Sequence, residues 1–113
     1  MIKERGGKVV VAPNVVADFQ RRLEQVVALI DSYEIPYEEI GIFGSYARKE
    51  YKATSDIDVC ILSDCRPNRR VSGELREEAE LLQVDIIFVT PKFLEESQEP
   101  LAIQLRKDYR RVR

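Results

Sequence analysis

Histidine is absent from the 113 residues of this chain. Its absence excludes a Ser-His-Asp triad, a cysteine nucleophile activated by histidine, a histidine-ligated zinc ion and a histidine general base. Acid–base catalysis would therefore depend on Asp, Glu, Lys, Tyr or Cys. The two cysteines, Cys60 and Cys65, are too few for a four-cysteine zinc site or a disulfide scaffold, so we expect reduced thiols.

Long apolar runs are also missing. No stretch approaches the ~18 residues that cross a membrane, and the VVVA cluster near the start is too short for the apolar part of a signal peptide. We therefore expect a cytoplasmic protein without membrane contact. The length suits a single domain, 1–113. The content of 44% hydrophobic and 34% charged residues is typical of a globular chain.

Charges of the two signs nearly balance, with 18 basic and 20 acidic residues and a net charge of −2. General nucleic-acid binders are usually basic, so this class is disfavoured, although a tRNA acceptor stays open. Acidic residues gather at Glu74, Glu77, Glu78 and Glu80, and basic residues gather over 106–113. Solvated helices or a charged partner surface would each explain both clusters.

Apolar periodicity and turn residues divide the chain into helices and strands. Residues 1–8 are expected to be a flexible terminus with a Gly6-Gly7 hinge. A long amphipathic helix is expected from an N-cap at Asn14 to a point before Pro36. Its core-facing stripe comprises Val16, Phe19, Leu23, Val26, Val27, Ile30 and Tyr33.

The rest of the chain alternates between short strands and helices. The expected order is strand 40–43, helix 46–51, strand 55–62, helix 70–81 with Ser72 as a cap, strand 84–89, helix 91–96, helix 99–107 and a closing strand at YRRV. Because strand 84–89 is nearly all apolar, we expect it to be buried on both faces. The alternation predicts an α/β (α+β) domain with a small mixed β-sheet flanked by helices.

Two carboxylates, Asp56 and Asp58, stand one residue apart at the start of a predicted strand. Alternate side chains of a strand share a face, so the two should lie close together. At about 5 Å two negative charges repel by roughly 1 kcal/mol even in water. A divalent cation would offset this repulsion, and oxygen ligands suit Mg²⁺ or Mn²⁺. The alternative is a turn-and-cap pair at Ser55-Asp56 beside a solvated Asp58.

A third carboxylate, Asp85, interrupts the apolar strand VDIIFV. A buried charge without a partner is costly, and a metal ion would supply the partner. An exposed residue at the strand entry is the alternative. If strand 84–89 pairs beside strand 56–62, all three acids converge at one end of the sheet.

Gly44 and Ser45 directly follow the apolar strand IGIF and precede a predicted helix. Glycine lets a ligand approach the backbone closely, and unpaired N–H groups at a helix start suit a phosphate. An ordinary loop would have the same sequence. A phosphate-binding turn together with three acids is what two-metal phosphoryl chemistry requires.

The stretch GSYARKEYKATSDIDV at 44–59 resembles the signature of the minimal nucleotidyltransferases, whose superfamily includes the kanamycin nucleotidyltransferases and DNA polymerase beta. The matching residues are Gly44, Ser45, Ala47, Arg48, Ser55, Asp56, Ile57 and Asp58, with Asp85 as the third acid. The resemblance covers about residues 40–95. It departs from the family pattern at Lys49, where the second glycine is usual; a left-handed backbone there would strain lysine by about 1 kcal/mol.

The resemblance implies a nucleotidyltransferase fold and a role for each matching residue. Gly44 and Ser45 would bind the outer phosphates of a nucleoside triphosphate, and Arg48 would hold phosphate or pack the motif. The acids at 56 and 58 would ligate two Mg²⁺ ions, with Mn²⁺ as an alternative metal. Asp85 would ligate one of these ions and could take the proton from the attacking hydroxyl.

The implied activity is transfer of a nucleoside monophosphate from a nucleoside triphosphate, ATP foremost, to a hydroxyl, with release of pyrophosphate. Because nothing in the chain is long enough to be an acceptor-binding domain, we expect the acceptor pocket to come from another chain or the acceptor to be a protein itself. Minimal family members are often encoded beside a HEPN-domain toxin, and some act as its antitoxin by adenylylating it. Two alternatives stay open: a non-catalytic antitoxin or adaptor that acts by binding, and a homo-oligomeric enzyme of the aminoglycoside-modifying kind.

Overall fold

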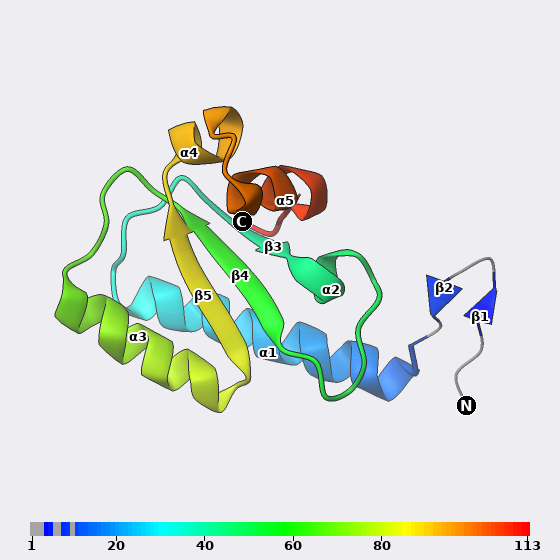
Figure 1. The fold of residues 1–113 in the computed structure, drawn as a ribbon. Helices are drawn as coiled ribbons and strands as arrows, with labels where there is room; N and C mark the ends of the chain where they lie inside the picture. Colours follow the sequence, from blue (N-terminus) through cyan, green and yellow to red (C-terminus); the bar gives the residue numbers. More distant parts are fainter. Residues whose placement is uncertain (1–3, 6–7, 10) are drawn as a thin grey trace.

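The computed structural model describes residues 4–5, 8–9 and 11–113 (Figure 1). Its elements in chain order are β1 (Glu4–Arg5), β2 (Lys8–Val9), α1 (Pro13–Ser32), β3 (Glu39–Phe43), α2 (Gly44–Ala47), β4 (Ile57–Leu62), α3 (Arg69–Leu81), β5 (Val84–Val89), α4 (Pro91–Glu96), α5 (Pro100–Asp108) and β6 (Arg110–Arg111). Across these described residues, no helix combines the length and the apolar character that a membrane span needs.

A four-stranded mixed sheet in the order β5-β4-β3-β6 forms the centre of the fold. β4 runs antiparallel to β3, with Phe43 opposite Asp58. β5 runs parallel to β4, with Asp85 opposite Asp58, and β6 pairs antiparallel with β3. The predicted mixed sheet with flanking helices is therefore confirmed, and its register places two of the three acids on neighbouring strands.

Helices cover the two faces of the sheet unequally (Figure 1). α1 and α3 pack on one face over a large apolar core that includes Phe19, Ile30, Val59, Leu75 and Ile86. The other face carries a smaller cluster of buried residues, Cys60, Leu62 and Leu105, with partly buried side chains of α4 packed against it. The cysteines carry free thiols, as expected, and only Cys60 is buried.

The N-caps of two helices, α1 and α3, differ from the sequence-based prediction. α1 begins at Pro13 with Ala12 as its N-cap, because proline at the first helical position has a helical φ and lacks the N–H that would be unpaired there. Asn14 therefore lies inside the helix. α3 begins after Asn68, whose side chain accepts the Val71 N–H at 2.8 Å, so Ser72 is not the cap.

Three further expectations need correction. Val16 is 36% exposed rather than packed in the core, because it lines an open groove beside Val112. β4 starts at Ile57, not at residue 55. Strand 84–89 is not buried on both faces, because it is the edge strand of the sheet. In the terminus that was expected to be flexible, Glu4–Arg5 pairs with Lys8–Val9 as β1 and β2, and the predicted hinge at 6–7 lies outside the described residues.

Candidate active site

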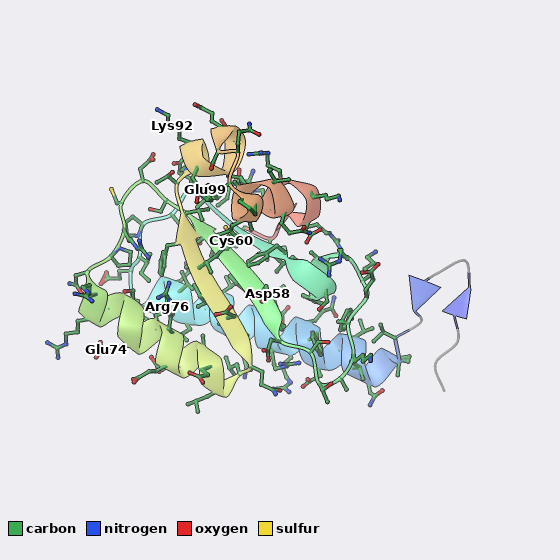
Figure 2. The ribbon with its side chains drawn as sticks, viewed as in Figure 1. Asp58, Cys60, Glu74, Arg76, Lys92 and Glu99 are labelled. Atoms are coloured by element: carbon green, nitrogen blue, oxygen red, sulfur yellow. The ribbon has the colours of Figure 1, made fainter. Side chains whose placement is uncertain are left out.

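Asp58 and Asp85 come together at one end of the sheet because β4 and β5 are parallel and in register there. The neighbours Ile57 and Val59 face the core under α1 and α3. Asp58, which is labelled in Figure 2, therefore points to the opposite face of the sheet. Asp56 precedes β4 rather than standing in it. The alternation of side chains along a strand therefore places Asp58 and Asp85 together but does not fix Asp56.

Asp58 is the half-buried member of this acidic group. Burial raises the pKa of its carboxyl to about 6, helped by the negative charges of Asp85 and then Asp56, while Arg48 opposes the shift. The three acids therefore repel one another in the unliganded fold. Asp85 itself is exposed on the edge strand, which is the alternative that the sequence left open for it.

Gly44 connects the end of β3 to α2 with a left-handed φ of +73°. A Cβ atom at this position would overlap Oδ2 of Asp58. The glycine is thus required twice, by its own backbone and by the carboxylate that lies against it. The sequence predicted glycine here for the approach of a ligand, whereas the structure adds the approach of Asp58.

α2 is a single turn that ends where Lys49 adopts a left-handed φ of 62°. The Lys49 N–H donates to the Tyr46 carbonyl at 3.1 Å, and the Glu50 N–H donates to the Ser45 carbonyl at 2.9 Å. This pair of bonds is a Schellman motif, in which glycine is the usual left-handed residue. The family's second glycine therefore corresponds to a left-handed position, and lysine occupies it here under strain. The helix predicted at 46–51 is accordingly shorter and starts earlier.

Arg48 makes its contacts within the chain. Its Nη1 donates to Oδ2 of Asp108 at 2.6 Å, and its Nε donates to Oε1 of Glu50 at 3.0 Å. Of the two roles predicted for Arg48, these contacts support packing of the motif. Asp108 is a residue that the sequence did not point to, because it stands in a basic run at the chain end and belongs to no recognisable motif.

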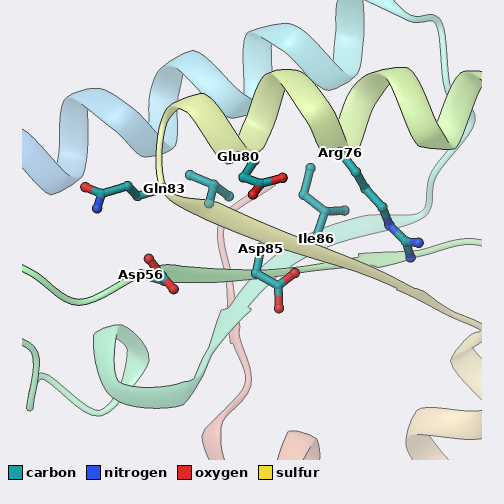
Figure 3. A pocket seen from close by; sticks show the side chains of 7 residues that line it. Asp56, Arg76, Glu80, Gln83, Asp85 and Ile86 are labelled. Carbon is teal, nitrogen blue, oxygen red and sulfur yellow. The ribbon is translucent and has the colours of Figure 1, made fainter.

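A pocket of about 590 Å³ opens beside the acidic end of β5 (Figure 3). Asp56 and Asp85 line it together with residues of α3, of the turn that follows it and of β5, namely Arg76, Glu80, Gln83, Val84 and Ile86. Figure 3 shows Asp85 pointing away from α3. Among the residues that the structure describes, no three His, Cys, Asp or Glu side chains are grouped closely enough to hold a metal ion.

The fold and the motif on it define the class of protein: a small domain in which a glycine turn packs against strand-borne carboxylates. A family profile described as a nucleotidyltransferase domain matches residues 21–112, and the chain belongs to this family. Comparison with curated proteins found no match. The chain is thus a nucleotidyltransferase domain, as the resemblance of residues 44–59 implied.

Solved structures share this fold. A toxin–antitoxin complex with AMP-PNP is 24% identical, with a TM-score of 0.57 over 78% of this chain and 69% of that chain. A complex of a tri-AMPylated HEPN toxin with its MNT antitoxin from Shewanella oneidensis is 22% identical, with a TM-score of 0.54 over 81% and 69%. A candidate nucleotidyltransferase from Sulfolobus solfataricus is 21% identical, with a TM-score of 0.60 over 88% and 86%.

Proposed function

We propose that this domain transfers a nucleoside monophosphate, AMP foremost, from the triphosphate to a hydroxyl group in a Mg²⁺-dependent reaction that releases pyrophosphate. One observation carries the proposal: within a nucleotidyltransferase domain, Asp58 lies between the Gly44 turn and Asp85. This arrangement supports a phosphate-binding backbone next to a pair of carboxylates, which is the combination that phosphoryl transfer needs.

The donor set suits a divalent cation. Carboxylate oxygens are the ligands that Mg²⁺ and Mn²⁺ prefer, and the raised pKa of Asp58, at about 6, reflects burial and repulsion that a cation would offset. Asp56 and Asp85 are exposed, so their side chains can rotate toward Asp58 without disturbing the core. We therefore assign Asp56, Asp58 and Asp85 as the residues that would hold the metal. When bound, the metal would stabilise negative charge on the reacting phosphate.

The residues of the chain then have separate tasks. The acceptor oxygen forms a bond to the α-phosphorus, the bond from that phosphorus to the bridging oxygen breaks, and pyrophosphate leaves with the bonding electrons. The turn at Gly44 and Ser45 binds the outer phosphates that become this leaving group. Asp85 accepts the proton from the acceptor hydroxyl, since it is exposed toward solvent and the chain has no histidine.

We infer that the acceptor hydroxyl belongs to a partner protein. Support comes from two complexes with this fold, one holding AMP-PNP and one holding a tri-AMPylated HEPN toxin beside its antitoxin. The acidic side chains at 74, 77, 78 and 80 are exposed on α3, and Glu80 also lines the pocket, so this helix favours a basic partner surface. The basic end suits docking less well, because Arg106 and Arg113 bond to Leu94 and Asp31 of the same chain.

The test uses ATP labelled at either the α- or the γ-phosphate, with Mg²⁺ and a HEPN-type partner protein. We expect label to reach the partner from the α position only, with one pyrophosphate released for each transfer. Asp58→Asn should abolish this labelling, whereas Asp31→Asn, an aspartate of α1 remote from the acids, should leave it unchanged. Equal labelling by Asp58→Asn would contradict the proposal.

The same assay separates the alternatives. Labelling of a small hydroxyl compound at full rate without any partner would replace the protein acceptor with a small molecule and indicate the aminoglycoside-modifying kind of enzyme. A stable complex with the partner but no label transfer and no pyrophosphate would indicate a non-catalytic antitoxin. Labelling of added tRNA would identify a nucleic-acid acceptor.

A further inference from the structure

Asp108, the last residue of α5, makes an unusual set of contacts for a residue outside the acidic cluster. Its side chain is 3% exposed. Its Oδ2 accepts hydrogen bonds from Arg48 Nη1 at 2.6 Å and Gln104 Nε2 at 2.9 Å. One buried carboxylate thus binds Arg48, the residue that follows the last turn of α2.

The charge on this carboxylate is maintained by its partners. Burial alone would raise the pKa of Asp108, but the hydrogen bonds from Gln104 and Arg48 outweigh it and hold the pKa below its usual range. Charge-assisted bonds of this kind are shorter and stronger than neutral ones. The network is therefore a firm connection between α5 and the turn at Gly44, not a surface ion pair.

α5 is itself fixed on the sheet. Ala102 and Leu105 are fully buried, and Leu105 packs with Cys60 and Leu62 of β4. Asp108 is consequently held in place by the same strand that carries Asp58. Two connections then define the position of the turn: the carboxylate of Asp108 on Arg48, and the carboxylate of Asp58 in close contact with Gly44.

We propose that Asp108 is a positioning residue for the nucleotide, fixing the Gly44-Ser45 turn and Arg48 in the geometry that receives the outer phosphates. This inference rests on the function proposed above. Within this turn, Gly44 supplies the backbone shape through its left-handed φ of +73°.

The first test replaces Asp108 with asparagine, which keeps the size of the side chain but loses the charge and one acceptor. The Arg48 and Gln104 donors then compete for a single uncharged carbonyl oxygen, so the turn loosens. If the turn binds the triphosphate equally in the ground and transition states, the variant loses affinity rather than turnover. We expect KM for ATP to rise about tenfold or more, with kcat changed less than about threefold, in keeping with loss of a charge-assisted bond.

Asp31→Asn is the matched control, because Asp31 also accepts from an arginine and a second side chain, Arg113 and Tyr37, far from the acids. Because Asp31 is 42% exposed, this variant should lose less stability than Asp108→Asn, and it should leave KM for ATP within about twofold. Measuring KM well below the melting temperature of each variant separates a loss of affinity from a loss of stability. If Asp108→Asn does not fold, Gln104→Ala removes one donor while keeping the charge, and it should raise KM in the same direction by a smaller factor.

A second readout does not depend on activity. Hydrogen exchange of the Arg48 backbone amide, which donates to the Gly44 carbonyl across the turn, should be about tenfold faster in Asp108→Asn than in the wild type when followed by NMR without nucleotide, because the turn is held less firmly. Unchanged exchange and unchanged KM in a folded variant would overturn the inference. If the wild type binds no nucleotide at all, the proposed function fails, whereas the exchange result still decides whether Asp108 fixes the turn.

Discussion

On one face of β4, Ile57, Val59 and Ile61 are fully buried beneath α1 and α3, whereas the other face of the same strand presents Asp58 and then Cys60. The first face is apolar along its whole length. The second is apolar only where α4 and α5 cover it, and it becomes acidic where β4 and β5 begin. A single residue step along the strand thus separates the side chains that stabilise the fold from those that support chemistry.

This difference explains why a repelling acidic pair can persist. The large apolar surface buried on one face stabilises the fold. This gain offsets the cost of charge repulsion and of the half-burial of Asp58 on the other face. Functional sites commonly carry such local costs. The two faces should therefore respond in opposite ways to substitution, in stability and in activity.

The largest expected effect is on the acidic face. Asp58→Asn should lower the rate of nucleotide transfer at least about a thousandfold, equivalent to about 4 kcal/mol of activation free energy, because a metal ligand is lost. The unliganded variant should be as stable as the wild type or more stable, since the charge repulsion with Asp85 and Asp56 falls. Kinetics and thermal melting on the same preparation measure both. A large loss of stability would show that Asp58 is structural.

The apolar face should show the reverse pattern. Ile61→Ala removes buried methyl groups from the core under α1 and should destabilise the fold by about 3 kcal/mol. The folded fraction should keep the ATP affinity of the wild type, because Ile61 points away from the acids. Urea unfolding measures the free energy of unfolding, and nucleotide titration at low temperature measures the ATP affinity of the folded protein. A weakened affinity of the folded protein would show that the two faces are coupled.

Metal binding should raise the stability of the folded protein, and this gain should depend on the carboxylates of the acidic face. An ion that binds only the native state adds RT ln(1 + [M]/Kd), about 2.7 kcal/mol at a hundredfold excess over Kd. Millimolar Mn²⁺ or Mg²⁺ should therefore raise the melting temperature of the wild type and of Ile61→Ala, but not that of Asp58→Asn. An unchanged melting temperature in the wild type, with and without ATP, would count against the metal site.

The pH dependence of the metal-free protein gives a smaller signal with a definite sign. Because the folded pKa of Asp58 is raised to about 6 from its usual 3.8, the protonated carboxyl favours the folded state. Its contribution to stability is fully present below about pH 4 and is lost as the pH rises through about 6. Asp58→Asn should lack this loss. With metal present the trend should reverse, since binding requires the ionised carboxylate.

Much of the arrangement could be predicted from the sequence, because it depends on local patterns. The period of the apolar residues predicted the order of helices and strands. The pairing of strand 84–89 beside strand 56–62 was only a condition in the sequence, and the structure shows that it places Asp58 opposite Asp85. The family's glycine at position 49 suggested that this residue could have a left-handed backbone, and Lys49 does have a positive φ.

The remaining features depend on contacts between distant parts of the chain. The exposure of Asp85 follows from the edge position of β5, which strand order decides and sequence periodicity does not. Asp108 and Arg48 are 60 residues apart, and no local pattern connects them. The start of α1 was mispredicted for another reason, because the sequence offers two acceptable helix starts. Pro13 at the first helical position prevailed over Asn14 as the N-cap.

The smallest expected effect concerns the strained turn at Lys49, in the connection between β3 and β4. Lys49 has a φ of 62°, which costs a side chain with a Cβ about 1 kcal/mol or more, while glycine loses some of that gain to its greater freedom in the unfolded chain. Lys49→Gly should therefore stabilise the protein by about 0.5–1 kcal/mol, a rise of about 4 °C in melting temperature. Lys52→Gly, in the same loop without a positive φ, should be neutral or destabilising. If both variants behave alike, loop flexibility rather than relief of backbone strain governs this turn, and the Schellman geometry at Lys49 has no energetic consequence.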